Sequence, residues 1–248
     1  MTAIIPTRIA AIIPVGTLEG AKTRLGGTLD AEERQDLVER LLARTVVVAL
    51  ATDGLDDVLV VSPDREVLRR AADLGARTLR QRSVGLNAGL DEGRQDVVAG
   101  GADAILVLPI DLPFVTTQAV AAVLERLTSA EALPPPGATF PLPGAALPHP
   151  DAAVAGIAAV AAVAAVADFA TVVLVTDRHG CGTNALALRP PHAIAFSFGP
   201  DSRRAPQAAA EAVGARYVEV DGPLAFDLDT PDDLVVVESM APEGIGAG

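Results

Sequence analysis

Six short segments rich in apolar residues alternate with longer amphipathic segments along the chain. The short segments have the length of β-strands and are residues 9–15, 57–62, 104–110, 171–176, 184–188 and 216–220. The longer segments predict helices at residues 31–51, 64–74, 87–102 and 116–127, with further helices expected after Arg204 and Thr230. Several strands are apolar at every position, which is typical of strands that are covered on both faces. The pattern therefore predicts an α/β fold, a three-layer sandwich with a mostly parallel sheet.

Residues 129–170 interrupt this alternation. Residues 134–150 are rich in Pro and Gly and lead into residues 152–167, which are almost entirely Ala and Val. These sixteen uncharged residues fall short of the roughly 20 that a helix needs to span a bilayer, so we expect a packed helix there. We interpret residues 129–170 as an insertion within a single domain that covers residues 1–248. The insertion could serve as an arm, a lid or an oligomer contact.

The composition narrows the classes of function. The chain has 248 residues, half of them hydrophobic, which is enough for one large core. Its formal net charge of −13 and its lack of Trp argue against a nucleic-acid partner, which requires a basic face or stacking aromatic residues. One cysteine cannot form an internal disulfide, and residues 1–15 lack a signal-peptide pattern, so we expect a cytoplasmic protein without a membrane segment.

In a parallel α/β sheet, ligands bind beyond the carboxyl ends of the strands. The loop after the first strand reads PVGTLEGAKTRLGG, and it offers backbone N–H groups with Lys22 and Arg24 to a phosphate. Its spacing differs from the P-loop motif G-x-x-x-x-G-K-[ST], because Ala21 stands where that motif needs glycine. A surface loop with solvated basic residues remains the alternative.

Carboxylates follow a strand at two places. Asp111 ends the apolar run AILVLPID, where it either caps a turn or binds a metal. In FDLDTPDDL an extended backbone would place Asp227 and Asp229 on one face, where a divalent cation could join them to phosphate oxygens. Thr230 reads as a helix N-cap followed by Pro231 at the first helical position.

Three glycine-containing turns offer further donors. In VGLNAGL, Asn87 is either the N-cap of a helix or a reader of a base edge. GCGTNAL and FGPDSRR combine small residues, hydroxyl groups and nearby arginines, which suits a ligand with phosphate and carboxylate groups, although both could be ordinary turns. No Ser-His-Asp or zinc pattern is present, and Cys181 has no assignable base, so acyl transfer is not expected.

Taken in order, six motifs resemble the guanylyltransferases of deazaflavin coenzyme F-420 biosynthesis: PVGTLEGAKTRL, GLNAGL, VLPIDLP, DRHGCGTNAL, FGPDS and FDLDTPDDL. The resemblance covers residues 9–234 without the insertion. It implies a nucleotide-diphospho-sugar-transferase-like, Rossmann-like fold. It also implies the reaction of GTP with a phosphorylated three-carbon acid, phosphoenolpyruvate or 2-phospho-L-lactate, with release of pyrophosphate and transfer of the product to a separate deazaflavin-condensing enzyme.

The same resemblance implies roles for individual residues, with Lys22, Arg24 and Asp111 as the catalytic ones. The implied nucleotide-binding residues are Pro14, Gly16, Lys22, Arg24, Leu86 and Asn87; the substrate-binding residues are Thr183, Gly199 and Ser202; and the Mg²⁺ ligands are Asp111, Asp227 and Asp229. The chain departs from the family where members usually carry Lys at the position of Gly16 and His soon after FGPDS. A homo-oligomer is compatible with the insertion.

Alternative functions follow from the same residues. Phosphoenolpyruvate is favoured over 2-phospho-L-lactate or 3-phosphoglycerate because an Ala/Arg-rich chain is more typical of the bacterial branch of that family. Nucleotidyltransferases that make molybdenum-cofactor dinucleotides or activated sugars favour a first loop richer in glycine than GTLEGAKTRL. A non-catalytic nucleotide sensor is favoured by Gly16 and opposed by the retained aspartates.

Overall fold

The computed structural model describes residues 7–18, 22–129, 170–199 and 202–240. In this part of the chain, seven strands form one sheet in the order β3-β2-β1-β4-β6-β5-β7. The strands are β1 (Ile9–Pro14), β2 (Asp57–Ser62), β3 (Arg77–Arg80), β4 (Ala104–Val107), β5 (Thr171–Thr176), β6 (Thr183–Arg189) and β7 (Arg216–Glu219). Only β6 among these runs against its neighbours β4 and β5, and the other pairs are parallel. The predicted mostly parallel sheet is confirmed.

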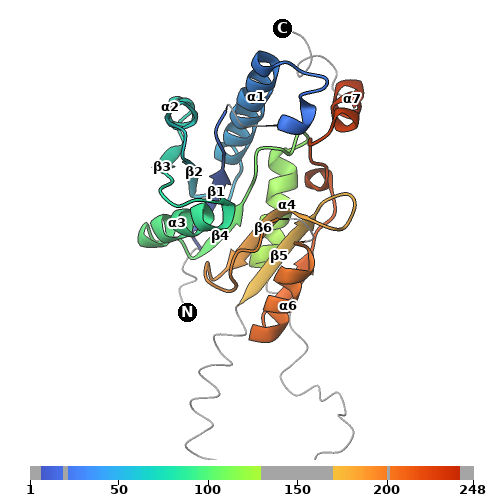
Figure 1. The fold of residues 1–248 in the computed structure, drawn as a ribbon. Helices are drawn as coiled ribbons and strands as arrows, with labels where there is room; N and C mark the ends of the chain where they lie inside the picture. The colour runs from blue at the N-terminus through green and yellow to red at the C-terminus, as the bar shows by residue number, and fades with distance from the viewer. Residues whose placement is uncertain (1–6, 19–21, 130–169, 200–201, 241–248) are drawn as a thin grey trace, which may run out of the picture.

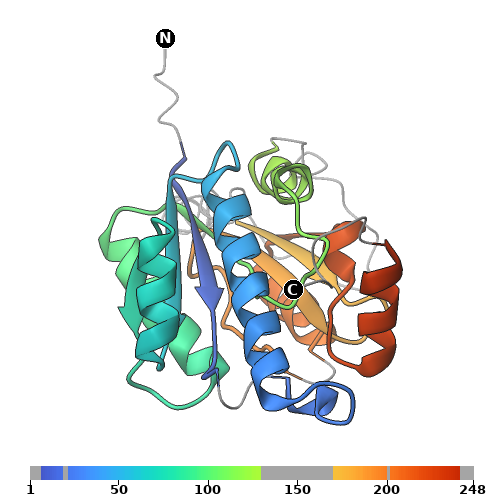
Figure 2. The ribbon, with the colours of Figure 1, turned by 90° about the horizontal axis from the view of Figure 1, so that it is seen from above.

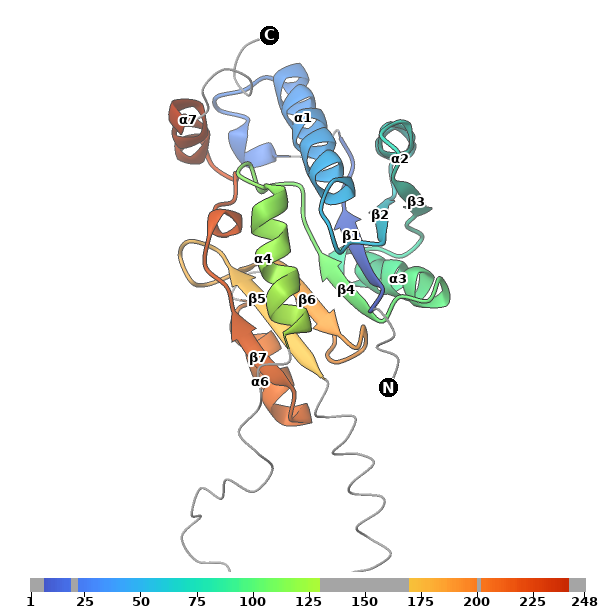
Figure 3. The same ribbon diagram turned by 180° about the vertical axis from the view of Figure 1, so that it is seen from behind.

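Helices cover both faces of the sheet. They are α1 (Ala31–Leu50), α2 (Arg65–Asp73), α3 (Leu86–Ala99), α4 (Thr117–Thr128), α6 (Arg204–Val213) and α7 (Pro231–Met240), with short 3-10 turns η1 (Thr23–Leu25) and η2 (Pro223–Ala225). Helices α1, α2 and α4 pack on one face, and Figure 3 shows them in front of the strands. Helices α3 and α6 pack on the other face, which is turned toward the viewer in Figure 1. The three-layer α/β sandwich is therefore confirmed.

Strand β1 illustrates why its sequence is apolar at every position. Ala11 and Ile13 point into the core beneath α1 and α4, and Ala10 and Ile12 point into the core beneath α3. Because side chains alternate between the two faces of a strand, a strand that has helices on both sides buries every residue.

A third apolar cluster lies beyond the end of the sheet, between α1, η1 and α7. Leu25 of η1 and Leu228, which precedes α7, are both fully buried there against Leu37 and Leu41 of α1. In Figure 2, α1 lies between α2 and the red helix α7. This cluster holds the loops that carry Lys22 and Asp229 close to each other.

Several boundaries differ from the sequence-based expectation. Strand β3 was not predicted, because its residues RTLR are polar and mostly exposed, as suits the edge of a sheet. Strand β4 ends at Val107, earlier than expected, near Pro109, which has no N–H to donate to a ladder. Helix α3 begins at Leu86 with Gly85 as its N-cap, so the reading of Asn87 as an N-cap is wrong.

The proposed insertion, residues 129–170, lies almost wholly outside the described residues, and its interpretation stays a prediction. Within the described ranges, no helix is both long and apolar enough to cross a membrane.

Candidate active site

A cavity of about 590 Å³ opens beyond the carboxyl ends of β1 and β4, and we call it the first cavity. Because β6 runs in the opposite direction, its first residues reach the same edge of the sheet. The predicted site residues that line the first cavity are Pro14, Gly16, Lys22, Leu86, Asp111, Thr183, Gly199 and Asp229. The site therefore lies where the rule for open α/β sheets places it.

A second cavity of about 480 Å³ adjoins the first. The residues common to both are Asp111, Thr183, Asn184, Gly199 and Asp229. The second cavity is also lined by Arg24, Asp177, Arg178, Cys181, Gly182 and Asp227. The two cavities thus meet at a pair of carboxylates, an arrangement that can hold two ligands with their reacting groups together.

Lys22 lies at this junction. Its ammonium nitrogen is 2.8 Å from Asp229 Oδ1 and 3.6 Å from Asp111 Oδ2, and its side chain is only 11% exposed. The exposed Arg24 adds a contact of 3.5 Å between its guanidinium group and Asp229 Oδ2. Lys22 has a left-handed backbone with φ 52°, and the chain turns there into η1. The basic loop and the two acidic segments predicted from the sequence are therefore brought together.

Gly16 lies in the loop between β1 and Lys22. Among the described residues, apart from its two neighbours in the chain, none has an atom within 4 Å of a Cβ atom built at Gly16. The loop is held from β2 by Ser62, whose hydroxyl donates to the carbonyl oxygen of Gly16 across 3.3 Å. Asp64, the N-cap of α2, accepts from the N–H of Leu18. The position of Gly16 thus has space for a larger side chain.

The segment with Asp227 and Asp229 runs beside Asp111. Leu228 is fully buried, while Asp227 and Asp229 on either side of it line the cavities, as the predicted extended backbone requires. Burial, together with repulsion from the charges of Asp229, Asp111 and Asp177, raises the pKa of Asp227 above its ordinary value. A group of carboxylates that repel one another in this way favours a bound cation.

Asp233 fixes the backbone that carries Asp229. Its buried carboxylate accepts from the N–H groups of Asp229 and Thr230 across 2.9 Å and 2.7 Å. Thr230 Oγ1 accepts in return from the N–H of Asp233, so the predicted cap of α7 is confirmed. Asp233 also forms an ion pair with Arg178, whose guanidinium lies 4.4 Å above the ring of Phe226.

The loop 177–182 between β5 and β6 forms one wall of the second cavity. Asp177 accepts from the N–H groups of Cys181 and Gly182 across 2.8 Å and 2.7 Å. A Cβ atom on Gly182 would lie 2.8 Å from Asp177 Oδ2, so this contact requires glycine. Thr183 follows, and its hydroxyl oxygen accepts from the hydroxyl group of Ser202 across 3.0 Å.

Asn87 and Ser202, both within the described ranges, line neither cavity. Ser202 is buried and reaches the site through Thr183. The side-chain amide of Asn87 is paired with the backbone of Phe198, accepting from its N–H across 2.9 Å and donating to its carbonyl oxygen across 3.0 Å.

Sequence reasoning missed the structural roles of Asp177, Phe198 and Asp233. Asp177 follows the apolar strand TVVLVT as Asp111 follows AILVLPI, so the same signal could have found it. For Asp233 the signal is the spacing Thr230-x-x-Asp233, which is that of a capping box. Phe198 acts through its backbone on Asn87, a distant residue, which no local pattern reveals.

Comparison with protein families and relatives agrees with this geometry. Residues 9–139 match the family model described as guanylyl transferase CofC like. A phosphoenolpyruvate guanylyltransferase from Rubrobacter xylanophilus is 41% identical over 232 residues, which are 93% of this chain and 94% of the relative. A protein of the same name from Sphaerobacter thermophilus is 39% identical, covering 94% of each chain.

The fold also resembles a solved structure. A candidate nucleotide-diphospho-sugar transferase from Desulfovibrio desulfuricans G20 superimposes with a TM-score of 0.64 at 16% identity, over 93% of this chain and 86% of that one. The likeness confirms the fold type predicted from the motifs.

Proposed function

This chain belongs to the guanylyl transferase CofC-like family, and we propose that it transfers GMP from GTP to phosphoenolpyruvate with release of pyrophosphate. The observation that carries the proposal is the meeting of the first and second cavities at Asp111 and Asp229. A transferase must hold a donor and an acceptor with their reacting groups in contact. The reaction is the guanylyl transfer step of coenzyme F-420 biosynthesis.

We assign GTP to the first cavity. Its volume of about 590 Å³ lies within the range of ligand pockets. Leu86 offers a half-exposed apolar side chain to the guanine, and Pro14 and Gly16 form the loop under the phosphates. Lys22 in this cavity, with Arg24 from the adjoining second cavity, supplies the positive charge that a triphosphate needs in a chain with a net charge of −13.

We assign the phosphorylated acid to the second cavity. Gly182 and Gly199 let the backbone approach the acid, and Thr183 lies at the junction with a hydroxyl group that Ser202 orients. Arg178 is held at the rim by Asp233 and Phe226. These groups suit a ligand with both a phosphate and a carboxylate.

The donor set fits a divalent metal, and we assign Mg²⁺. The ammonium group of Lys22 contacts both Asp111 and Asp229, so one cation can reach both carboxylates, with Asp227 beside them. Within the described residues, no three His, Cys, Asp or Glu side chains form a metal-binding group by themselves. Mg²⁺ commonly uses one or two carboxylates together with substrate phosphates. When bound, the ion would neutralise phosphate charge and help to orient the two substrates.

The reaction does not require the protein to remove a proton from the attacking group. An ionised phosphate oxygen of the acid attacks the α-phosphorus of GTP. The bond from that phosphorus to the bridging oxygen breaks, and pyrophosphate leaves with the electron pair. Lys22 and Arg24 reduce the repulsion between the two anions and stabilise the charge on pyrophosphate. No general base is required, because the attacking phosphate oxygen is already ionised at neutral pH.

Pyrophosphate release tests the proposal. Purified protein is given GTP and Mg²⁺ with phosphoenolpyruvate, 2-phospho-L-lactate or 3-phosphoglycerate in parallel reactions. We expect the fastest release with phosphoenolpyruvate. Fastest release with another acid would correct the acceptor, and GTP binding without release from any acid would favour a nucleotide sensor. Transfer of the product to a deazaflavin-condensing enzyme, a cytoplasmic location and a homo-oligomer remain predictions.

A further inference from the structure

We propose that Asn87 is a positioning residue that holds Gly199 in place for the acceptor, rather than a residue that reads the guanine. The inference rests on the proposed function, because it assigns Asn87 to the acceptor side of that same reaction. Leu86 and Phe198 line the first cavity, and Gly199 lines both cavities. Asn87 follows Leu86 and Phe198 precedes Gly199, so the hydrogen bonds between Asn87 and Phe198 connect the segments that carry Leu86 and Gly199.

Asn87 is joined to the backbone of Phe198 by two hydrogen bonds. The amide oxygen of Asn87 accepts from the N–H of Phe198 across 2.9 Å, and its amide nitrogen donates to the carbonyl oxygen of Phe198 across 3.0 Å. The side chain therefore pairs with a backbone residue as a neighbouring strand would. This pairing fixes the plane of the amide against Phe198, and the side chain of Asn87 lines neither cavity.

The hydrogen bonds between Asn87 and Phe198 hold the backbone beside Gly199. Gly199 follows Phe198 directly and has a φ of 148°, a conformation that L-residues with a side chain rarely adopt. Beyond it, the hydroxyl of Ser202 donates to Thr183. Gly199 is thus anchored on one side by Asn87 through Phe198, and on the other by Ser202 through Thr183. Asn87 belongs to helix α3 and Thr183 to strand β6, so each anchor is a side-chain hydrogen bond that involves a regular element of the fold.

Helix α3 carries a second residue, Arg94, that contacts the same segment as Asn87. Arg94 lies two turns after Asn87 in α3, and it donates to the carbonyl oxygen of Ile194 across 3.0 Å. Its guanidinium also lies 4.5 Å above the ring of Phe196. Helix α3 therefore holds residues 194–198 at two points, of which only Asn87 adjoins the cavities. Arg94 lines neither cavity and provides a matched control.

The test compares Asn87→Ala with Arg94→Met in steady-state assays and in GTP binding by calorimetry. For Asn87→Ala, we expect the KM for the phosphorylated acid to rise about tenfold, since both hydrogen bonds that hold Phe198 are lost. The GTP dissociation constant and kcat should change less than about twofold. For Arg94→Met, we expect lower thermal stability with an unchanged KM for the acid.

Three outcomes would overturn the proposal. Weaker GTP binding or a lost preference for GTP over ATP in Asn87→Ala, with an unchanged KM for the acid, would assign Asn87 to the base. An equal rise of that KM in Arg94→Met would mean general loosening of residues 194–198. Hydrogen exchange of peptides that contain Phe198 provides a measurement without turnover, and unchanged exchange in Asn87→Ala would refute the anchor. If wild-type protein turns over no acid, the proposed function fails, while the exchange result still decides on the anchor.

Discussion

The backbone N–H of Leu228 donates to the backbone carbonyl oxygen of Asp111 across 2.8 Å. This bond joins the loop after β4 to the segment before α7. Because Leu228 is fully buried, its two neighbours are directed toward the cavities. The carboxylates of Asp111 and Asp229 are therefore placed by backbone pairing and core packing, and their removal should alter chemistry more than folding.

Asp111→Asn and Asp229→Asn should each lower kcat/KM by at least about 100-fold, since each removes a charge that orients the phosphates and the metal. Pyrophosphate release and thermal unfolding would be measured together. Asp232→Asn, on the exposed first turn of α7, is the control and should retain activity. An active Asp111→Asn protein would contradict the role given to this carboxylate.

Lys22→Gln should change metal binding and turnover in opposite directions. Its ammonium group contacts both Asp111 and Asp229, so without nucleotide it competes with a divalent cation. We expect about tenfold tighter Mn²⁺ binding, measured by electron paramagnetic resonance in the absence of GTP, with at least about 100-fold lower turnover.

Arg24→Gln is the graded control for Lys22→Gln. Arg24 has a side chain that is 75% exposed, and of the carboxylates in the described residues it contacts only Asp229, across 3.5 Å, so its loss should tighten Mn²⁺ binding much less. Equal or weaker metal binding in Lys22→Gln would rule out the competition.

Gly16→Lys should strengthen GTP binding several-fold. In the described part of the chain, no atom beyond those of its two chain neighbours lies within 4 Å of a Cβ built there, and the new ammonium group would extend along the proposed phosphate loop. Calorimetric titration with GTP measures the change. Gly27→Lys is equally free of steric conflict and lines neither cavity, so it controls for the added charge. Weaker GTP binding in Gly16→Lys would show that this loop does not face the phosphates.

Thr183→Val should raise the KM for the acid about tenfold, because it removes a hydroxyl group at the junction and leaves that of Ser202 without its acceptor. Cys181→Ser, two residues away, should leave turnover nearly unchanged. The cysteine is exposed, and its backbone N–H, which the substitution keeps, makes the contact with Asp177. The opposite result would point to chemistry at the thiol.

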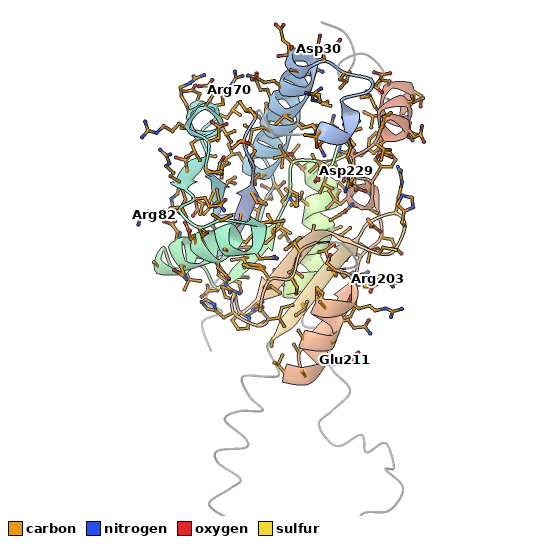
Figure 4. The ribbon with its side chains drawn as sticks, in the orientation of Figure 1. Asp30, Arg70, Arg82, Arg203, Glu211 and Asp229 are labelled. Atoms are coloured by element: carbon orange, nitrogen blue, oxygen red, sulfur yellow. The ribbon has the colours of Figure 1, made fainter. Side chains whose placement is uncertain are left out.

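Glu92 should stabilise the loop before α3 in a pH-dependent way. The nearby side chain of Ser83 and hydrogen bonds from the N–H groups of Arg82 and Ser83 lower the pKa of Glu92 below its ordinary value of 4.5. This contribution is therefore complete above pH 4.5 and is lost as the pH falls through the lowered value. Urea unfolding should separate Glu92→Gln from wild type at pH 7 and bring the two together in strong acid. A gap that persists in acid would contradict this. In Figure 4, Arg82 and Asp229 lie on opposite sides of the molecule. We therefore expect the turnover of Glu92→Gln at pH 7 to equal that of the wild type.

Much of the fold could be predicted because apolar strands and capped helices carry local signals. Helix α1 begins where Asp30 and Glu33 form a capping box, and α4 begins after the N-cap Thr116. Strand β3 has no such signal: its residues are polar, and it is a strand because β2 provides a partner. The reversal of β6 was also hidden, since direction depends on the connection rather than on the residues.

The candidate site divides in the same way. Lys22, Asp111 and Asp229 could be found because charges beside strand ends are conspicuous in the sequence. Asn87 could not be assigned, because its partner Phe198 is more than a hundred residues away. Asp233 was taken only as part of the first turn of α7. Its buried carboxylate also forms an ion pair with Arg178 across the second cavity.

The reversed direction of β6 makes one side of the site local in the sequence. Loop 177–182 joins neighbouring antiparallel strands, and it closes on itself through Asp177. The residues that line the first cavity, in contrast, come from many segments, among them the loops after β1 and β4, the start of α3 and the start of β6, and none of them belongs to residues 177–182. The hairpin loop can therefore change in length or sequence without shifting a crossover. Changes in this one loop can therefore reshape one wall of the second cavity and leave the lining of the first cavity in place.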